Sequence, residues 1–378
     1  MITEAAEQGS GNIVKRTCSE IARIRLMPTK DAGSTDVKLR LFRINRSNEF
    51  SGPRRSHLQL IPKHRQYHRA IVMVHCRPLL CVLLDVRACD WEEMKMSEKD
   101  TNGGIRLLRE SREYWRVTLD IPPINIFGPA NIPQLEEIVS SLESDPQVKV
   151  VVFESAVEGF FLTHYDFLAD PEESAKFPVG RTGLQALPDM LARLSRASVV
   201  SIASIRGRAT GVGSELALAS DMRFASREKA VLSQWEVGAG LVPGGGPMAR
   251  LPRLIGRGRA LEVLLGADDV NGDLAELYGY VNRSLPDNQL DAFVDALARR
   301  ISTFDRQAIA ETKRLVNLNS LPSDAEIVPE WDAFTASLGR PAAQARLRAL
   351  FEKGFHKPGD VENRLGFHVG TLDPIAQL

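Results

Sequence analysis

The sequence predicts an α/β protein with mostly parallel β-sheets. Short apolar runs of the kind that form buried strands alternate with segments in which apolar residues recur at helical spacing. Glycines and prolines separate many of these runs, as expected for turns between strands and helices. The alternation begins at Glu113 and continues for most of the remaining chain, so the predicted ordered part starts there.

The first predicted elements follow one another closely. Apolar and polar residues alternate over 113–119, which indicates a strand, and two prolines end it. Helical spacing predicts a helix over 132–142, and the run VKVVVF predicts a buried strand over 148–153. A second helix over 183–194 and a second buried strand over 198–205 repeat this pattern.

Residues 205–247 hold two glycine clusters and the most informative part of the chain. The first cluster leads into a predicted helix over 214–220, with Thr210 placed to cap it. Short strands over 221–225 and 230–232 are expected next, before the second cluster turns the chain into a helix over 247–254. Further helices are then predicted over 258–265, 274–277, 288–304, 306–317 and from Pro329 to about 353.

The chain is expected to divide into four parts. Residues 1–95 form a basic N-terminal extension with little stable structure, 96–270 an α/β core, 271–355 a helical region and 356–378 a tail. The extension carries 17 Lys and Arg against 10 Asp and Glu, and all four cysteines of the chain. A metal site on these cysteines and histidines, a start of translation near Met94 or Met96, and nucleic-acid binding remain alternatives for it.

Composition restricts the function classes. The formal net charge of zero argues against both a nucleic-acid binder and a membrane-surface protein. The most apolar run is too short to span a bilayer, and the N-terminus lacks the regions of a signal peptide. No cysteine follows Cys89, which is typical of a reducing compartment. We therefore expect a cytoplasmic protein, without a metal or a membrane partner.

Two glutamates are the catalytic candidates. Glu215 falls in the first turn of the predicted helix, beside backbone N–H groups that can hold a developing negative charge. Glu236 has apolar neighbours, and a partly buried carboxyl has a raised pKa that suits proton donation near neutrality. The alternatives are structural, because Glu215 also complements a helix dipole and Glu236 also fits a solvated loop.

A third candidate is the segment GFFLTHYDFL, which follows the first buried strand where α/β folds place functional loops. His164 is either an accessory catalytic group or a hydrogen-bonded structural residue, and Asp166 is expected to cap the following turn. The glycine patterns exclude two common nucleotide motifs. GVGSEL lacks the third glycine of the dinucleotide fingerprint, and GGGPMAR lacks the lysine of a P-loop.

At these residues the chain resembles the crotonase, or enoyl-CoA hydratase/isomerase, superfamily. The resemblance rests on SIASIRGRATGVGSELALASDMRFAS and LSQWEVGAGLVPGGGPMARLPRLIGRGRALEVLLGA, and it extends over about 113–355. It implies a superhelix of ββα units, a C-terminal helical region involved in forming a homotrimer or hexamer, and acyl-CoA thioesters as substrates. Coenzyme A would enter as part of the substrate, with no separate cofactor.

The resemblance also implies residue roles. The backbone N–H groups of Tyr165 and Val212 would hold the thioester oxygen as an enolate, and Glu215 with Glu236 would manage water and the α-proton. Lys313 matches a position near the CoA phosphates, with a solvated helix lysine as the alternative. The chain departs from the family at Tyr165 and Val212, where smaller residues are usual, so a reshaped acyl pocket is expected.

Because both glutamates are present, hydration of a 2-enoyl-CoA, a lyase reaction, is the leading prediction. The alternatives are a double-bond isomerase, a thioester hydrolase, and a non-catalytic binding protein that keeps the fold.

Overall fold

The structure is a computed structural model of the 378-residue chain and describes residues 24–26, 39–41, 69–76, 80–87 and 103–372. The chain divides into two compact units, Met1–Thr101 and Asn102–Leu378. The described residues of the first unit form two antiparallel strand pairs, β1 (Ile24–Leu26) with β2 (Leu39–Leu41) and β3 (Arg69–Cys76) with β4 (Leu80–Arg87). The rest of the predicted N-terminal extension, and the side chains of its cysteines and histidines, lie outside what the structure describes.

The second unit is built on two sheets, and the predicted α/β class with mostly parallel strands is confirmed. In the larger sheet, five strands run parallel and β5 pairs antiparallel at the edge, in the order β14-β11-β9-β7-β6-β5. These strands are β5 (Gly104–Arg109), β6 (Tyr114–Asp120), β7 (Val150–Ser155), β9 (Val200–Ile205), β11 (Met222–Ser226) and β14 (Arg283–Leu285).

The smaller sheet has the order β13-β12-β10-β8. Its strands are β8 (Phe160–Leu162), β10 (Arg208–Thr210), β12 (Val231–Ser233) and β13 (Val270–Asn271). The chain crosses between the sheets in a regular way, because β7, β9 and β11 are each followed by a strand of the smaller sheet. Three successive ββα units result, in agreement with the predicted superhelix.

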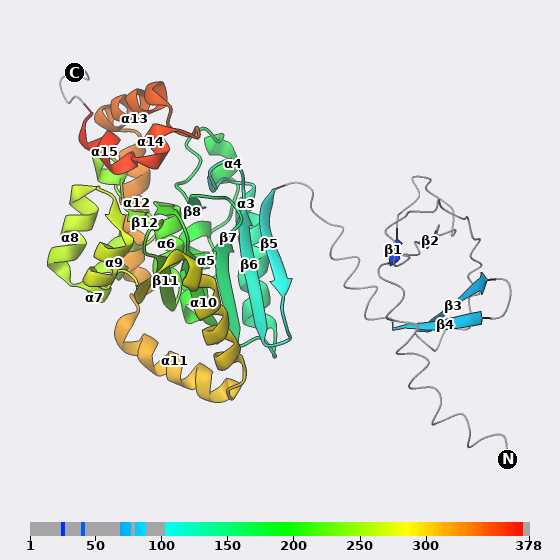
Figure 1. The fold of residues 1–378 in the computed structure, drawn as a ribbon. Helices are drawn as coiled ribbons and strands as arrows, with labels where there is room; N and C mark the ends of the chain where they lie inside the picture. The colour runs from blue at the N-terminus through cyan, green and yellow to red at the C-terminus, as the bar shows by residue number, and fades with distance from the viewer. Residues whose placement is uncertain (1–23, 27–38, 42–68, 77–79, 88–102, 373–378) are drawn as a thin grey trace, which may run out of the picture. The chain divides into compact units, whose positions relative to one another are not determined.

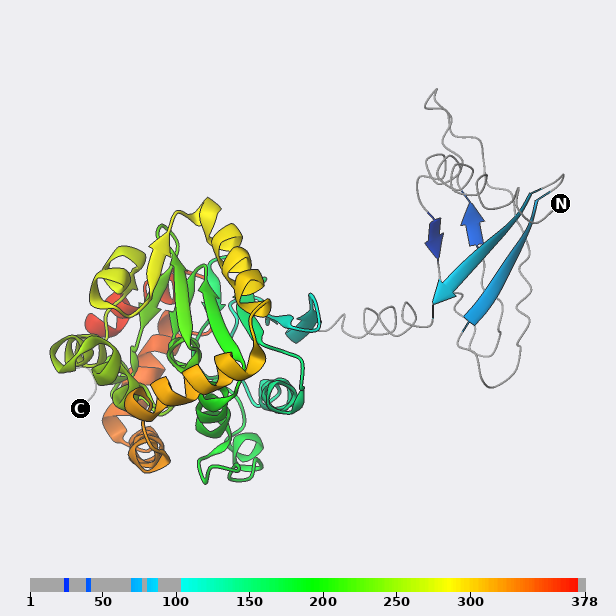
Figure 2. The same ribbon diagram turned by 90° about the horizontal axis from the view of Figure 1, so that it is seen from below.

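Both faces of the larger sheet are covered, which explains why its central strands are almost continuously apolar. Along β7, Val150 and Val152 pack with α10, whereas Val151 and Phe153 belong to the main core on the other face. Trp115 of β6 also enters the main core, so the pleat sends alternate side chains to opposite faces. The ribbon views show α10 lying across the strands of this sheet (Figure 1, Figure 2).

Helices follow the expected order with small shifts of their ends. Those before the second glycine cluster are α3 (Asn131–Ser144), α4 (Pro171–Ala175), α5 (Ala186–Arg196), α6 (Val212–Ala219) and the 3-10 helix η1 (Glu236–Ala239). Those after it are α7 (Pro247–Ile255), α8 (Arg257–Gly266), α9 (Gly272–Tyr278), α10 (Asp287–Ser302), α11 (Arg306–Ser320), α12 (Asp324–Leu338), α13 (Pro341–Lys353), α14 (Asp360–Asn363) and α15 (Leu365–Gly370).

Two local predictions are wrong. Thr210 does not cap α6, because it lies in β10 and the cap residue is Gly211, which makes no side-chain cap. The helix expected from Pro329 to about 353 is two helices: α12 begins earlier, at Asp324, and holds the proline inside it, and α13 begins at Pro341. A reciprocal capping box between Ser323 and Glu326 starts α12, which explains why it extends to the N-terminal side of the proline.

The predicted tail is also corrected. Residues 360–370 form α14 and α15, and a cluster of apolar side chains buries them against Trp235. The contributing residues from this segment are Val361, Leu365, Val369 and Leu372. In Figure 1, α13, α14 and α15 gather at one end of the unit. Helices α14 and α15 are too short to show a helical period, but tertiary packing holds them in place.

Candidate active site

The first wall of the site is the loop that follows β8. Phe127 holds this loop by two backbone hydrogen bonds, donating its N–H to the carbonyl of His164 (3.1 Å) and accepting from the N–H of Asp166 (2.9 Å). Between them, the N–H of Tyr165 points away from Phe127, as the parallel-bridge pattern requires. As predicted, Asp166 caps the next turn by accepting from the N–H of Leu168 at 2.9 Å.

The second wall is the turn Gly211-Val212-Gly213 at the start of α6. The N–H of Gly213 donates to the carbonyl of Thr163 at 3.0 Å, which joins this turn to the first wall. A methyl group on Gly213 would lie 1.7 Å from the carbonyl oxygen of Leu162, so only glycine permits this approach. Gly211 adopts a φ of 53°, and its Cα hydrogen faces Glu236. The first glycine cluster therefore brings both walls together.

Two backbone N–H groups are left free at this junction. Among the described residues, no hydrogen-bond acceptor faces the N–H of Tyr165 or that of Val212. Both residues line the same cavity. The N–H of Val212 also lies at the positive end of the α6 dipole. Two free donors on residues that line one cavity can stabilise a negative charge on an oxygen atom placed between them.

Two buried carboxyl groups line the same cavity. Glu215, one turn into α6, accepts a hydrogen bond from the N–H of Gly245 at 2.7 Å and is 4% exposed. Glu236, at the start of η1, is 6% exposed, and its Oε2 has no partner among the described residues. An unpaired carboxyl oxygen at this depth is costly unless a ligand or a proton satisfies it.

Burial shifts the protonation of both groups toward the acid form. Burial raises the pKa of Glu215 to about 7, although the N–H of Gly245 and the charge of Arg250 oppose the shift. Burial and then the neighbouring charge of Glu215 raise the pKa of Glu236 well above its ordinary value. Both shifts favour the protonated form, and the negative charge of either carboxylate disfavours ionisation of the other.

The cavity has a volume of about 940 Å³ and a mostly apolar wall. Its lining comes from the two walls described above, from the segment around α4 and α5, and from helices α12 and α13. The aromatic side chains that line it are Tyr165, Phe167, Phe177, Trp235, Trp331, Phe334 and Phe351. Such a lining favours an apolar ligand that presents a single polar group to the two N–H donors.

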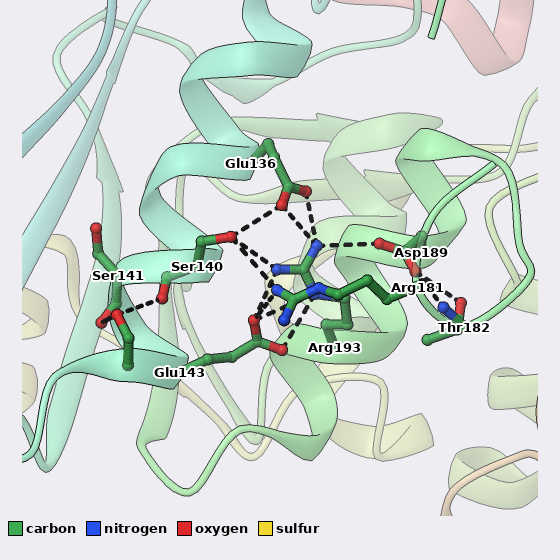
Figure 3. Close-up of polar contacts among 9 residues, drawn as sticks. Glu136, Ser140, Ser141, Glu143, Arg181, Thr182, Asp189 and Arg193 are labelled. Atoms are coloured by element: carbon green, nitrogen blue, oxygen red, sulfur yellow. Dashed lines mark hydrogen bonds and ion pairs between the residues drawn. The ribbon is translucent and has the colours of Figure 1, made fainter. Parts of the chain in front are cut away.

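A buried network fixes the part of this wall next to α5. Arg193 is 6% exposed and binds Glu136 and Glu143 of α3 together with Asp189 (Figure 3). The second oxygen of Asp189 accepts from both the N–H and the hydroxyl of Thr182, each at 2.8 Å. These contacts hold the segment before α5, whose neighbouring residues line the cavity.

The structure thus brings five of the six predicted site residues to one cavity: His164, Tyr165, Val212, Glu215 and Glu236. Lys313 is not among them. Its buried ammonium pairs with Asp221 at 2.7 Å and donates to the carbonyl of Val199, in a second cavity beside α11.

Sequence reasoning missed the groups that support Glu215. Arg250 donates to the carbonyl of Gly245 at 2.8 Å, and Glu330 accepts from the N–H groups of Met248 and Ala249 at the start of α7. Together they hold the second glycine cluster against Glu215. The only signal in the sequence was the cluster itself, because Glu330 reaches the start of α7 only through folding.

An α/β superhelix of ββα units with two free N–H donors and two buried carboxyl groups defines a protein of the crotonase type. The family model for enoyl-CoA hydratase/isomerase matches residues 110–330, which is more than half of the chain. The chain belongs to this family.

Several known proteins are similar to the chain. Enoyl-CoA hydratase domain-containing protein 2, mitochondrial, of Mus musculus is 36% identical over 165 residues, which cover 44% of this chain and 55% of that protein. The chain therefore spans about half the length of this curated relative. Crotonyl-CoA hydratase of Syntrophomonas wolfei is 29% identical over 232 residues, which cover 61% of this chain and 88% of that protein.

Solved structures share the fold. A crystal structure described as a candidate enoyl-CoA hydratase from Streptomyces avermitilis is 40% identical, has a TM-score of 0.68 and covers 73% of this chain and all of that chain. An enoyl-CoA hydratase from Mycobacterium avium subsp. paratuberculosis, at 24% identity and a TM-score of 0.59, supports the fold alone. Within the part of the chain that the structure describes, no helix is long and apolar enough to cross a membrane.

Proposed function

We propose that the protein hydrates a 2-enoyl-CoA thioester. The observation that carries this proposal is the pair of buried carboxyl groups, Glu215 and Glu236, beside the free N–H groups of Tyr165 and Val212 in one cavity. Hydration needs a base for water, an acid for the α-carbon and donors for the enolate oxygen. The site holds one group for each task.

The reaction would proceed through an enolate. Glu215 takes a proton from water while the water oxygen bonds to the β-carbon of the enoyl group. The π electrons move onto the thioester oxygen, where the N–H groups of Tyr165 and Val212 stabilise the negative charge. Glu236 then gives its proton to the α-carbon. A proton transfer from Glu215 to Glu236 through solvent restores the starting state.

The test uses purified protein and crotonyl-CoA. Glu236→Gln keeps the size of the side chain and removes the acid, so turnover should fall by about 10²- to 10⁴-fold. The matched control is Glu352→Gln, a surface change on α13 that should leave turnover as in the unmodified protein. Unchanged turnover in a folded Glu236→Gln protein would remove this residue from the mechanism.

The alternatives give different outcomes in the same assay. A double-bond isomerase depends mainly on one acid-base group, so Glu215→Ala would be tolerated much better than Glu236→Ala. A thioester hydrolase would release free coenzyme A. A non-catalytic protein would do neither, and calorimetry would then show whether it still binds an acyl-CoA. The presence of both carboxyl groups in one cavity favours hydration.

We further propose that the chain forms a homo-oligomer, the trimer being the form that the family resemblance implies. In the single chain, no apolar side chain of α11 is fully buried, and this helix exposes Leu315, Val316 and Leu318 by 53%, 59% and 70%. Exposed apolar side chains on one helix favour a protein contact. Light scattering on the purified protein tests this, and a monomer at micromolar concentration would contradict it.

A further inference from the structure

The loop that carries Tyr165 also carries a histidine with a fully buried ring. His164 is 1% exposed, and its Nδ1 lies 3.0 Å from the carbonyl oxygen of Tyr165. Its Nε2 lies 3.0 and 3.2 Å from the two carboxyl oxygens of Glu362. Glu362 belongs to α14, 198 residues further along the chain, and is itself 1% exposed. Both ring nitrogens are therefore engaged by protein atoms.

The chemistry of these contacts accounts for both ring nitrogens of His164. A carbonyl oxygen only accepts hydrogen bonds, so Nδ1 of His164 donates to the Tyr165 carbonyl, and Nε2 shares a proton with the carboxyl group of Glu362. Burial alone would raise the pKa of Glu362, but the charge and hydrogen bond of His164 and the N–H of His356 (2.8 Å) lower it. With no free nitrogen, His164 is poorly suited to act as a base toward substrate.

The surrounding side chains hold the ring in one orientation. The centroid of the Phe355 ring lies 4.3 Å from the centroid of the His164 ring. The His356 ring stacks on the His164 ring with a distance of 4.7 Å between the ring centroids. Trp235 contacts it edge-on at 5.6 Å. Burial and the charge of His164 lower the pKa of His356 to about 3, so this second ring stays neutral, and its Nδ1 lies 3.3 Å from Asp166. The ring of His164 is therefore packed among the rings of Phe355, His356 and Trp235.

The ring completes the fixation of the Tyr165 backbone. Phe127 holds the peptide on the N-terminal side of Tyr165 through the carbonyl of His164, and His164 Nδ1 holds the carbonyl of Tyr165 on the other side. We propose that His164, paired with Glu362, is a positioning residue that orients the Tyr165 N–H toward the thioester oxygen and makes α14 part of the active-site frame. This inference rests on the proposed function, because it assigns the Tyr165 N–H to an enolate.

Two double variants isolate the contact between His164 and the carbonyl of Tyr165. An asparagine amide superposes on Nδ1 of histidine, and a glutamine amide on Nε2, so His164→Asn keeps the donor to the Tyr165 carbonyl and His164→Gln loses it. Both are made together with Glu362→Gln, so that neither leaves a buried carboxylate without its partner. His368→Asn is the control, because it removes another histidine–carboxylate pair of the C-terminal segment, with Asp360, outside the lining of the cavity.

Turnover of crotonyl-CoA is the first readout. The double variant of His164→Gln with Glu362→Gln should lose about tenfold or more in kcat with little change in KM. A small misplacement of an oxyanion donor acts on the transition state, not on substrate binding. The His164→Asn pair should recover most of that loss, and His368→Asn should behave as the unmodified protein. Equal kcat values for the two pairs at equal melting temperature would overturn the inference.

The second readout does not require turnover. Acetoacetyl-CoA forms an enolate whose absorption differs from that of the keto form, so its spectrum when bound reports on the oxyanion site. The enolate fraction should fall in the His164→Gln pair and return in the His164→Asn pair. A protein that shows this pattern without hydrating crotonyl-CoA would refute hydration and keep the inference, whereas a protein that binds no acyl-CoA would refute both.

Discussion

Replacing Gly245 by alanine tests the role of Glu215 without touching its carboxyl group. A methyl group at this position would lie 2.1 Å from Oε2 of Glu215, 2.3 Å from Cδ and 2.8 Å from Oε1. Non-bonded carbon atoms need about 3.5 Å, so the carboxyl group must move away by about 1 Å or more. The hydrogen bond from the Gly245 N–H, now 2.7 Å, would be strained or lost.

The expected effect follows from the position of the base. A shift of about 1 Å costs about 10²-fold in rate, which corresponds to about 2.7 kcal/mol in the activation free energy. Because the role we propose for Glu215 is to activate water, KM for crotonyl-CoA should change little while kcat falls. The control is Gly258→Ala in α8, where no atom lies within 4 Å of the added methyl group. Steady-state kinetics and melting temperatures are measured for both variants.

Full turnover in a Gly245→Ala protein with an unchanged melting temperature would refute this reasoning. It would mean either that the carboxyl group tolerates the displacement or that Glu215 is not the base. Glu215→Gln separates the two explanations, since this change removes the base and leaves an acceptor for the Gly245 N–H.

Three further predictions concern charge. The value of kcat/KM should fall below about pH 7 as Glu215 takes up a proton, and again at higher pH as Glu236 loses the proton it must donate. A kcat/KM that does not change with pH would contradict both roles. Between about pH 4.5 and 7 the folded protein keeps the proton on Glu215, whereas the unfolded chain releases it. The contribution of this group to the free energy of unfolding is therefore largest below pH 4.5 and is lost as the pH rises through 7. Glu215→Gln should therefore raise the melting temperature more at pH 8 than at pH 5, as measured by calorimetry. Arg193→Ala should destabilise the fold by about 3 to 5 kcal/mol in urea unfolding, because it leaves the buried carboxylate of Asp189 without its cation, whereas Arg181→Ala, which removes a 65% exposed partner of Glu143, should cost less than about 1 kcal/mol.

The longer elements could be predicted because their signals are local. The helix over α3 and the strand β7 show their periods within a dozen residues, and their predicted ends differ from the observed ones by at most two residues. Strands β8, β10 and β13 have three residues or fewer, so no period exists to detect. The helices α14 and α15 were not predicted either, because they are also too short to show a period. Their stability comes from burial against Trp235.

The glycine turn and the two glutamates were visible in the sequence because each has a local meaning. A glycine before a helix and an acid in its first turn fit an anion site wherever they occur. The free N–H groups of Tyr165 and Val212 came from the family resemblance, and the structure places both at the cavity. The supports from Arg250 and Glu330 had no local signal.

The sequence by itself therefore determined the α/β class, the order of the longer elements and the residues that carry charge into the site. Only the tertiary structure decided which of these residues meet. Lys313 pairs with Asp221, outside the lining of the main cavity, whereas Glu362 crosses 198 residues of sequence to bind His164. The physical reason is that side-chain pairing in a buried core depends on how sheets and helices pack, and this packing is set by contacts across the whole unit.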